Sequence, residues 1–231
     1  MKLGIFGGTF NPIHFGHLRA AEEVRELAGL DRVLFMPSGT PPLKSGDIAS
    51  ARHRLEMTLA AVRGAPGFEV LDIEITGRGK SYTVHTLKKL HALYPSDRLY
   101  LILGIDAFAD IPNWYMPDLI CASADFIVLS RPGFRFADLS ASPYLSIKGR
   151  ELKALDAGIK ALHSGRLRSG RDVMLLNISP INISATDIRT LITQGRSVKY
   201  LLPAEVESFI ISHKLYAFKK TKDRALKRGC R

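Results

Sequence analysis

Short, nearly continuous runs of apolar residues recur along the chain, separated by stretches in which apolar positions return every three or four residues. A short continuous apolar run is typical of a strand that is buried on both faces of a parallel sheet. The runs predict strands at Lys2–Phe6, Arg32–Met36, Phe68–Ile75, Arg98–Gly104, Asp125–Ser130 and Asp172–Ile178.

The stretches with three-to-four-residue spacing predict helices between these strands. They lie near His17–Ala28, Ala51–Arg63, Tyr82–Leu93 and Thr186–Thr193, and a last amphipathic helix starts after Pro203 and runs to about Leu215. Strands that alternate with helices favour right-handed crossovers. We therefore predict the α/β class, with a doubly wound, mostly parallel, Rossmann-like sheet and helices on both faces.

One segment, from about residue 134 to 171, breaks this alternation. It holds a stretch rich in Ser and Pro, a helical piece at Arg150–Leu162, and then Gly and Arg residues. We interpret it as an insertion between two strands that serves as a lid or a partner surface. Residues 1–218 are then a single domain, and residues 219–231 form a basic tail.

Composition narrows the class of protein. With 46% hydrophobic and 24% charged residues, the chain is not expected to be disordered. The apolar run at the N-terminus is too short for a signal peptide, and no run approaches the roughly 20 residues of a membrane span, which predicts a cytoplasmic protein without a membrane partner. The two cysteines support neither a disulfide framework nor a zinc site, and Cys121 reads as a core thiol.

The formal net charge of +11 is unevenly distributed, because residues 219–231 carry seven Lys or Arg and one Asp. The tail holds +6, and the remaining +5 on the rest of the chain suits a protein that binds phosphate-rich anions. The tail itself is more often a solvated, frayed C-terminus than a nucleic-acid contact.

The most informative segment follows the first predicted strand, where Gly7 and Gly8 lead into a polar turn and then a helix carrying His14 and His17. Glycines let a phosphate approach the backbone, and free N–H groups at a helix N-terminus attract it. Histidines three positions apart share one helix face. A metal site is a weaker alternative because no third ligand is nearby, and either histidine alone would more often be structural.

A second polar cluster, Ile183-Ser184-Ala185-Thr186-Asp187-Ile188-Arg189, opens the predicted helix near the C-terminus. Ser184 is a good N-cap, which is sufficient reason for its presence. Capping does not account for Arg189, a permanently charged fork that can reach an anion held at the helix N-terminus.

These two segments carry a resemblance to a known family. The turn through His14-Phe15-Gly16-His17 is similar to the HxGH signature of the nucleotidyltransferase superfamily, and the fuller match is to bacterial nicotinate-mononucleotide adenylyltransferases. The second cluster resembles that family's ISSTxxR signature. Three positions depart from the family's pattern: Asn11 stands for Asp, Leu43 for His and Ala185 for Ser.

Further short motifs match in order and spacing. They are Lys44 in a loop like the family's PPHK, Ser81-Tyr82-Thr83, Gly104-x-Asp106 with Trp114, Arg131-Pro132-Gly133, and Val198-x-Tyr200-Leu201-x-Pro203. The segment 134–171 and the tail after Lys219 are not covered by these motifs.

The resemblance implies transfer of the adenylyl group of ATP to nicotinate mononucleotide, with Mg²⁺ accompanying ATP. The implied catalytic residues are His14, His17, Lys44 and Arg189. The implied ATP-binding residues are Gly7, Gly8, Thr9, Phe10, Gly104, Asp106, Ser184, Thr186 and Arg189. The implied substrate-binding residues are Asn11, Tyr82, Thr83, Trp114 and Arg131.

Several of these residues could instead have a purely structural role. Asp106 can cap a helix, Trp114 can belong to the core, and Tyr82 and Thr83 can simply begin a helix. Rival functions are a sister transferase acting on phosphopantetheine, FMN or a CTP-linked alcohol phosphate, a nucleic-acid-binding module that uses the tail, and an inactive NAD sensor. The sequence leaves open whether the chain forms a homo-oligomer.

Overall fold

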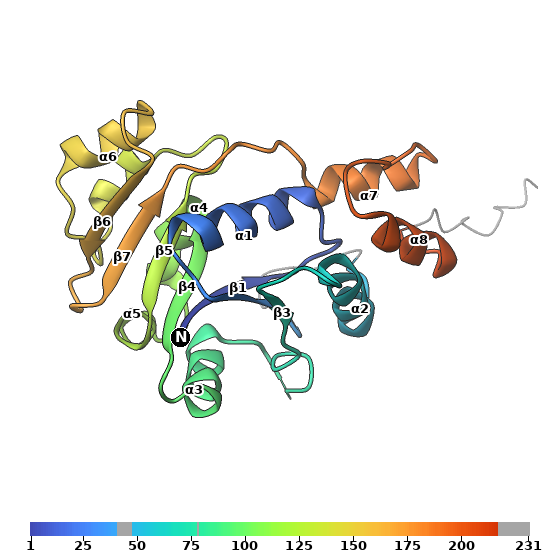
Figure 1. The fold of residues 1–231 in the computed structure, drawn as a ribbon, viewed down its shortest axis with the longest axis horizontal. Coiled ribbons are helices and arrows are strands. Elements are labelled where there is room, and N and C mark those ends of the chain that lie inside the picture. The colour runs from blue at the N-terminus through green and yellow to red at the C-terminus, as the bar shows by residue number, and fades with distance from the viewer. Residues whose placement is uncertain (41–47, 78, 217–231) are drawn as a thin grey trace, which may run out of the picture.

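The computed structural model describes residues 1–40, 48–77 and 79–216, and its strands form one sheet in the order β3-β2-β1-β4-β5-β7-β6 (Figure 1). The strands are β1 Lys2–Gly8, β2 Arg32–Pro37, β3 Phe68–Val70, β4 Arg98–Gly104, β5 Asp125–Leu129, β6 Leu162–Arg166 and β7 Asp172–Leu176. All neighbouring pairs are parallel except β6 with β7. The predicted doubly wound, mostly parallel sheet is confirmed.

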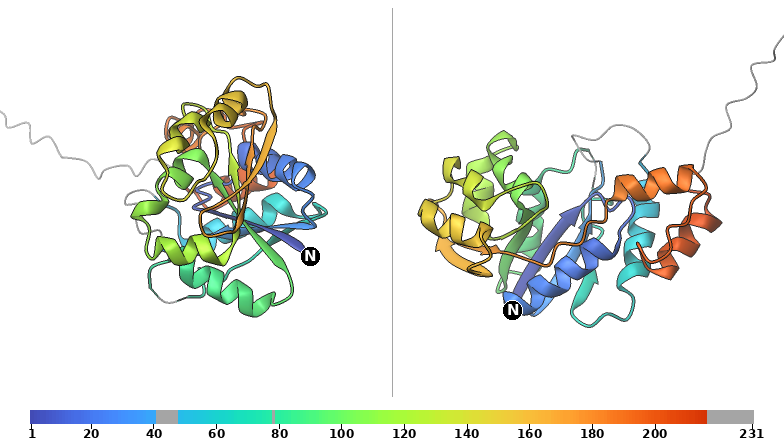
Figure 2. Two further views of the ribbon diagram at one scale, coloured as in Figure 1. Left: turned by 90° about the vertical axis from the view of Figure 1, so that its left-hand side faces the viewer. Right: turned by 90° about the horizontal axis from the view of Figure 1, so that it is seen from above.

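The helices are α1 Phe15–Leu27, α2 Ala51–Val62, α3 Thr83–Leu93, α4 Ile105–Ala109, α5 Pro117–Ser123, α6 Gly149–Asp156, α7 Ala185–Thr193 and α8 Ala204–Ser212, with 3₁₀ turns η1 Ile111–Asn113 and η2 Phe136–Ala141. Figure 2 shows α6 at one end of the molecule and α7 with α8 at the other. No helix in the described part of the chain is long and apolar enough to cross a membrane.

Alternation of side chains along each strand divides the core into two layers. On β4, Leu99 and Leu101 pack with α3, α4, α5 and α6, whereas Tyr100 and Ile102 pack with α1, α2, α7 and α8. Both sets are buried because successive side chains of a strand point to opposite faces. This is the reason that the strands appear in the sequence as continuous apolar runs rather than as alternating ones.

Strand β3 is shorter than the predicted Phe68–Ile75, and the partner strand explains why. The backbone N–H of Leu71 still donates to Phe35 O at 2.9 Å. The next bond of a parallel ladder would need an N–H from Pro37, which has none. The chain then turns, with Ile75 N–H donating to Asp72 O at 2.8 Å.

The segment 134–171 contributes to the same sheet. Its helix α6 ends earlier than the predicted Arg150–Leu162, because Gly158 adopts a φ of +69° just after the C-cap. Residues 162–166 then form β6, an antiparallel edge strand against β7 that the sequence pattern did not predict. Its sequence, Leu-His-Ser-Gly-Arg, has little β-propensity, so pairing with β7 rather than local preference accounts for it.

Candidate active site

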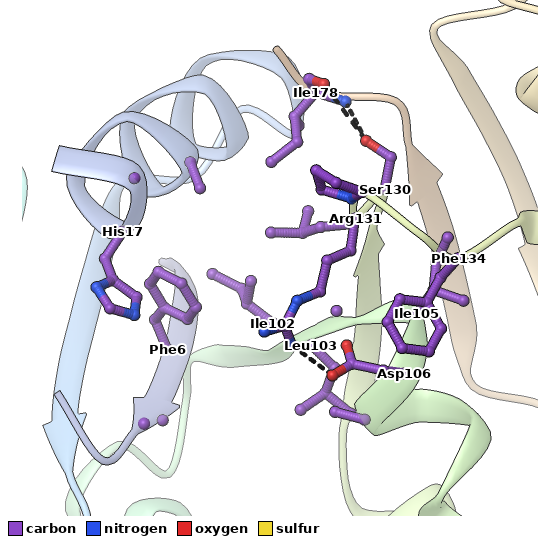
Figure 3. A pocket seen from close by; sticks show the side chains of 18 of the residues that line it. Phe6, His17, Ile102, Leu103, Ile105, Asp106, Ser130, Arg131, Phe134 and Ile178 are labelled. Atoms are coloured by element: carbon purple, nitrogen blue, oxygen red, sulfur yellow. Dashed lines mark hydrogen bonds and ion pairs between the residues drawn. The ribbon is translucent and has the colours of Figure 1, made fainter. Parts of the chain in front are cut away.

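A cavity of about 1450 Å³ lies at the carboxyl ends of β1, β4 and β5. The strand order reverses direction between β1 and β4, and such a switch point leaves a crevice between the loops that leave the two strands. The loops after β1, β4, β5 and β7 all line the cavity. Figure 3 shows His17 on one wall and Asp106 with Arg131 on the opposite wall.

His14 and His17 lie together at the start of α1. Their ring centroids are 3.8 Å apart, and the backbone N–H of His14 donates to His17 Nδ1 at 3.3 Å. Because His17 Nδ1 accepts, an uncharged His17 ring carries its proton on Nε2. Both rings line the cavity, but His14 is the extended N-cap of α1, so the two histidines meet at the helix start rather than on one helix face. Their role toward a ligand stays a prediction.

Gly16 permits this arrangement of rings. A Cβ at position 16 would lie 3.0 Å from His14 Cε1 and Nδ1, closer than real Cβ contacts normally come. Phe10, which is 2% exposed, packs edge-on against His17 with centroids 5.1 Å apart. The predicted ATP-binding residue Phe10 therefore supports the imidazole from the core side.

Burial decides the charge of His14. The side chain is 6% exposed, and desolvation lowers the pKa of His14 from 6.5 to about 4. At neutral pH the ring is uncharged. His14 can therefore offer a hydrogen bond to an anion but no positive charge.

The cluster at α7 lies against the same cavity. Ser184 caps the helix, since its Oγ accepts from the N–H groups of Thr186 and Asp187 at 3.2 and 3.4 Å. Arg189 donates through Nη2 to Thr186 Oγ1 at 3.2 Å and through Nη1 to Asn11 O at 2.9 Å. The structure thus joins two segments that are 178 residues apart, and Arg189 and His17 line one cavity.

Opposite the histidines, Asp106 and Arg131 form an ion pair between the loops after β4 and β5. Gly104 leaves room for it, since a Cβ there would lie 2.6 Å from Asp106 Oδ1. Asp106 is not the N-cap of α4, a position held by Gly104. Among the described residues, no group hydrogen-bonds the buried Asp106 Oδ1, which is free to accept from a ligand.

Thr83 and Trp114 also line the cavity. Trp114 is half-buried against the core and donates its indole N–H to Asp110 Oδ2 at 3.1 Å, which fixes the plane of its ring. Tyr82 is not among the lining residues. Its ring packs on Tyr115 with centroids 4.7 Å apart, so its side chain lies beside the site rather than in it.

Asn11 lines the cavity, but its side-chain oxygen accepts from the N–H of Ala49 at 3.0 Å and the hydroxyl of Tyr216 at 2.7 Å. Its amide is therefore already engaged with protein. Lys44, the remaining predicted catalytic residue, lies outside the described residues.

Sequence reasoning missed the residues that support the site. Glu74 lines the cavity and accepts from Thr86 Oγ1 at 2.8 Å, and burial raises the pKa of Glu74. Arg54, 1% exposed, is the largest fully buried side chain among the described residues. A sequence signal existed for Arg54, because Met57 and Thr58 place it on the buried face of α2.

The segment 134–171 also reaches the cavity. It contributes Phe134, Arg135, Phe136, Leu155 and Asp156 to the lining. The carboxylate of Asp156 accepts from the N–H groups of Phe136 and Ala137 at 2.7 and 2.9 Å, which ties α6 to η2. The segment therefore forms part of the wall beside the Asp106–Arg131 pair.

Residues 5–191 match the family model described as cytidylyltransferase-like. Among curated relatives, a protein from Syntrophotalea carbinolica is 43% identical over 218 residues, covering 94% of this chain and 97% of its own. One from Geobacter sulfurreducens is 42% identical over 219 residues, covering 94% and 99%. Both are named probable nicotinate-nucleotide adenylyltransferase.

Among solved structures, a Plasmodium falciparum nicotinic acid mononucleotide adenylyltransferase complexed with NaAD superimposes with a TM-score of 0.70. The match covers 93% of this chain and 97% of that one at 20% sequence identity. At that identity the likeness concerns the fold, and it supports the doubly wound arrangement described above.

Proposed function

The chain belongs to the nicotinate-nucleotide adenylyltransferase family, and from this premise we propose that it transfers the adenylyl group of ATP to nicotinate mononucleotide. The products are nicotinate adenine dinucleotide and pyrophosphate, in the biosynthesis of NAD. The observation that carries the proposal is that His14, His17 and Arg189 line one cavity at the carboxyl ends of the central strands.

The reaction needs alignment and charge neutralisation more than proton transfer. A phosphate monoester has a second pKa of about 6 and is already largely dianionic at neutral pH, so the acceptor can attack the α-phosphorus of ATP without a general base. Two anions must be brought together in line with the leaving pyrophosphate. The protein accordingly supplies donors and cations around the phosphates.

Residues at the N-termini of α1 and α7 supply these donors and cations. Neutral His14 and the Nε2–H of His17 donate hydrogen bonds to phosphate oxygens as negative charge builds. Arg189 adds a permanent positive charge, aimed by its bonds to Asn11 O and Thr186 Oγ1. We assign Lys44 the same role from its position in the motif, although it lies outside the described residues.

ATP would enter as its complex with a divalent cation, which we propose is Mg²⁺. Within residues 1–40, 48–77 and 79–216, no group of three His, Cys, Asp or Glu side chains is placed to hold a metal ion. The cation would then be held by the triphosphate and water, with which Mg²⁺ readily completes its shell. When bound, it would neutralise part of the phosphate charge.

The opposite wall suits the nucleosides. The free Oδ1 of Asp106 can accept from ribose hydroxyl groups, and Arg131 holds the other carboxylate oxygen. We assign the pyridine ring to the part of the lining that includes Thr83 and the fixed indole of Trp114. Since these substrates are intracellular phosphorylated metabolites, we propose that the enzyme works in the cytoplasm.

The test is pyrophosphate release from ATP with nicotinate mononucleotide, nicotinamide mononucleotide and phosphopantetheine assayed side by side. Turnover with the first acceptor supports the proposal, and turnover with phosphopantetheine alone rejects it in favour of a sister transferase. His17→Ala should lower kcat by roughly 10²–10³-fold with the fold intact. His91→Ala, which removes an exposed imidazole outside the cavity, is the matched control. An active His17→Ala enzyme would refute the assigned role.

A further inference from the structure

The last part of the described chain returns to the first turn. The hydroxyl of Tyr216 donates to Asn11 Oδ1 at 2.7 Å, across 205 positions of sequence. Tyr216 does not line the cavity, whereas Asn11 does. We propose that Tyr216 is a positioning residue for adenylyl transfer, acting through Asn11 on Arg189. This inference rests on the proposed function.

Asn11 connects Tyr216 with Arg189. It is 5% exposed, its Oδ1 accepts from both Tyr216 and the N–H of Ala49, and its carbonyl oxygen accepts from Arg189 Nη1 at 2.9 Å. One residue therefore contacts the start of α2, the middle of α7 and the C-terminal segment. Tyr216 contacts the side chain of Asn11 and Arg189 contacts its backbone carbonyl, so a change in the conformation of Asn11 would alter one of the two contacts that hold the Arg189 guanidinium.

Arg54 also contacts the turn that follows β1. Its buried guanidinium donates to Thr9 O and Gly39 O at 2.8 Å and to Ala49 O at 3.1 Å. Burial in this setting lowers the pKa of Arg54, but an arginine remains charged. Arg54 thus fixes Thr9 and Ala49, and the Tyr216 hydroxyl adds to the Ala49 N–H a second donor on Asn11 Oδ1.

The Tyr216 hydroxyl is well placed to remain a donor. Its ring packs against the core layer of α1, α2, α7 and α8, and its carbonyl oxygen accepts from Thr193 Oγ1 at 3.2 Å. Burial raises the pKa of Tyr216, an effect that outweighs the opposing influence of the nearby Arg189 and Arg54. The phenol therefore stays protonated through the working pH range of an enzyme.

The experiment uses full-length Tyr216→Phe, which keeps the ring and deletes only the donor. Loss of one hydrogen bond predicts about a 3- to 10-fold decrease in kcat/KM for ATP and a similar weakening of ATP binding by calorimetry. Tyr200→Phe, at an 82% exposed tyrosine, is the matched control and should behave like the wild type.

A double-mutant cycle separates positioning from general stability. If Tyr216 acts on Arg189, Tyr216→Phe should change neither kcat/KM nor ATP affinity in an Arg189→Ala background. An equal loss in both backgrounds, no loss in the single variant, or a Tyr216→Phe chain that no longer folds would each overturn the proposal.

The outcomes remain distinct from those for the function itself. A wild-type chain that binds ATP but does not use nicotinate mononucleotide rejects the proposed acceptor, and the ATP dissociation constants of the four proteins in the cycle still decide the role of Tyr216. A wild-type chain that binds no ATP rejects both.

Discussion

The burial of His14 predicts a specific loss of stability in acid. The pKa of His14 falls from 6.5 to about 4 on folding because the ring is desolvated. A histidine with a lowered folded pKa contributes its full stability above pH 6.5 and loses it as the pH falls from 6.5 towards 4. At 1.36 kcal/mol per pH unit, this group alone should cost about 2 kcal/mol at pH 5 and about 3 kcal/mol below pH 4.

The measurement is chemical denaturation of the wild type and His14→Gln at pH 7.5, 6.5, 5.5 and 5.0, since glutamine keeps a polar side chain but cannot titrate. The difference in unfolding free energy at pH 7.5 reflects packing, and only its change with pH reports the titration. We expect the wild type to lose about 2 kcal/mol more than the variant between pH 7.5 and 5.0. His91→Gln, at an exposed ring, controls for removal of an imidazole. If the unfolding free energies of His14→Gln and wild type change equally with pH, the titration of His14 does not affect stability and the prediction is wrong.

Three further predictions concern other parts of the molecule. Gly7 lines the cavity, and a Cβ at this position would meet nothing within 4 Å. Gly7→Leu should therefore weaken ATP binding by about 10- to 100-fold without changing the melting temperature, whereas Gly149→Leu, at an exposed helix start, should leave ATP binding unchanged. Equal ATP affinities of Gly7→Leu and wild type in calorimetry would contradict this prediction. Arg98→Ala leaves the buried carboxylate of Asp125 without its partner at 2.5 Å and should lower the unfolding free energy in denaturant by about 1–3 kcal/mol, with the activity per folded molecule retained. Glu74, whose folded pKa is raised by burial, should have the opposite pH signature to His14: the stability of wild type relative to Glu74→Gln should fall as the pH rises above 4.5, and a difference that is constant with pH would exclude it.

The fold class and the two polar segments that line the cavity could be predicted from the amino-acid sequence. Strands buried on both faces read as continuous apolar runs, so β1, β2, β4, β5 and β7 were predictable nearly to the residue. Gly7 with Gly8 and Ser184 with Arg189 were recognisable because close backbone approach, helix capping and a permanent charge each demand particular residue types. These features depend on residues that are adjacent in the sequence, so the sequence alone is enough to recognise them.

Features that depend on partners remote in the chain could not be predicted from the sequence and became visible in the folded molecule. Strand β3 stops because the neighbouring strand offers Pro37 where a donor is needed, and β6 exists because β7 offers an unpaired edge. His14 is neutral because other elements desolvate it, and Asn11 is held by Tyr216 from the far end of the chain. Such effects arise from which groups folding brings within a few ångströms of one another, and that proximity is a property of the packed molecule rather than of any stretch of its sequence.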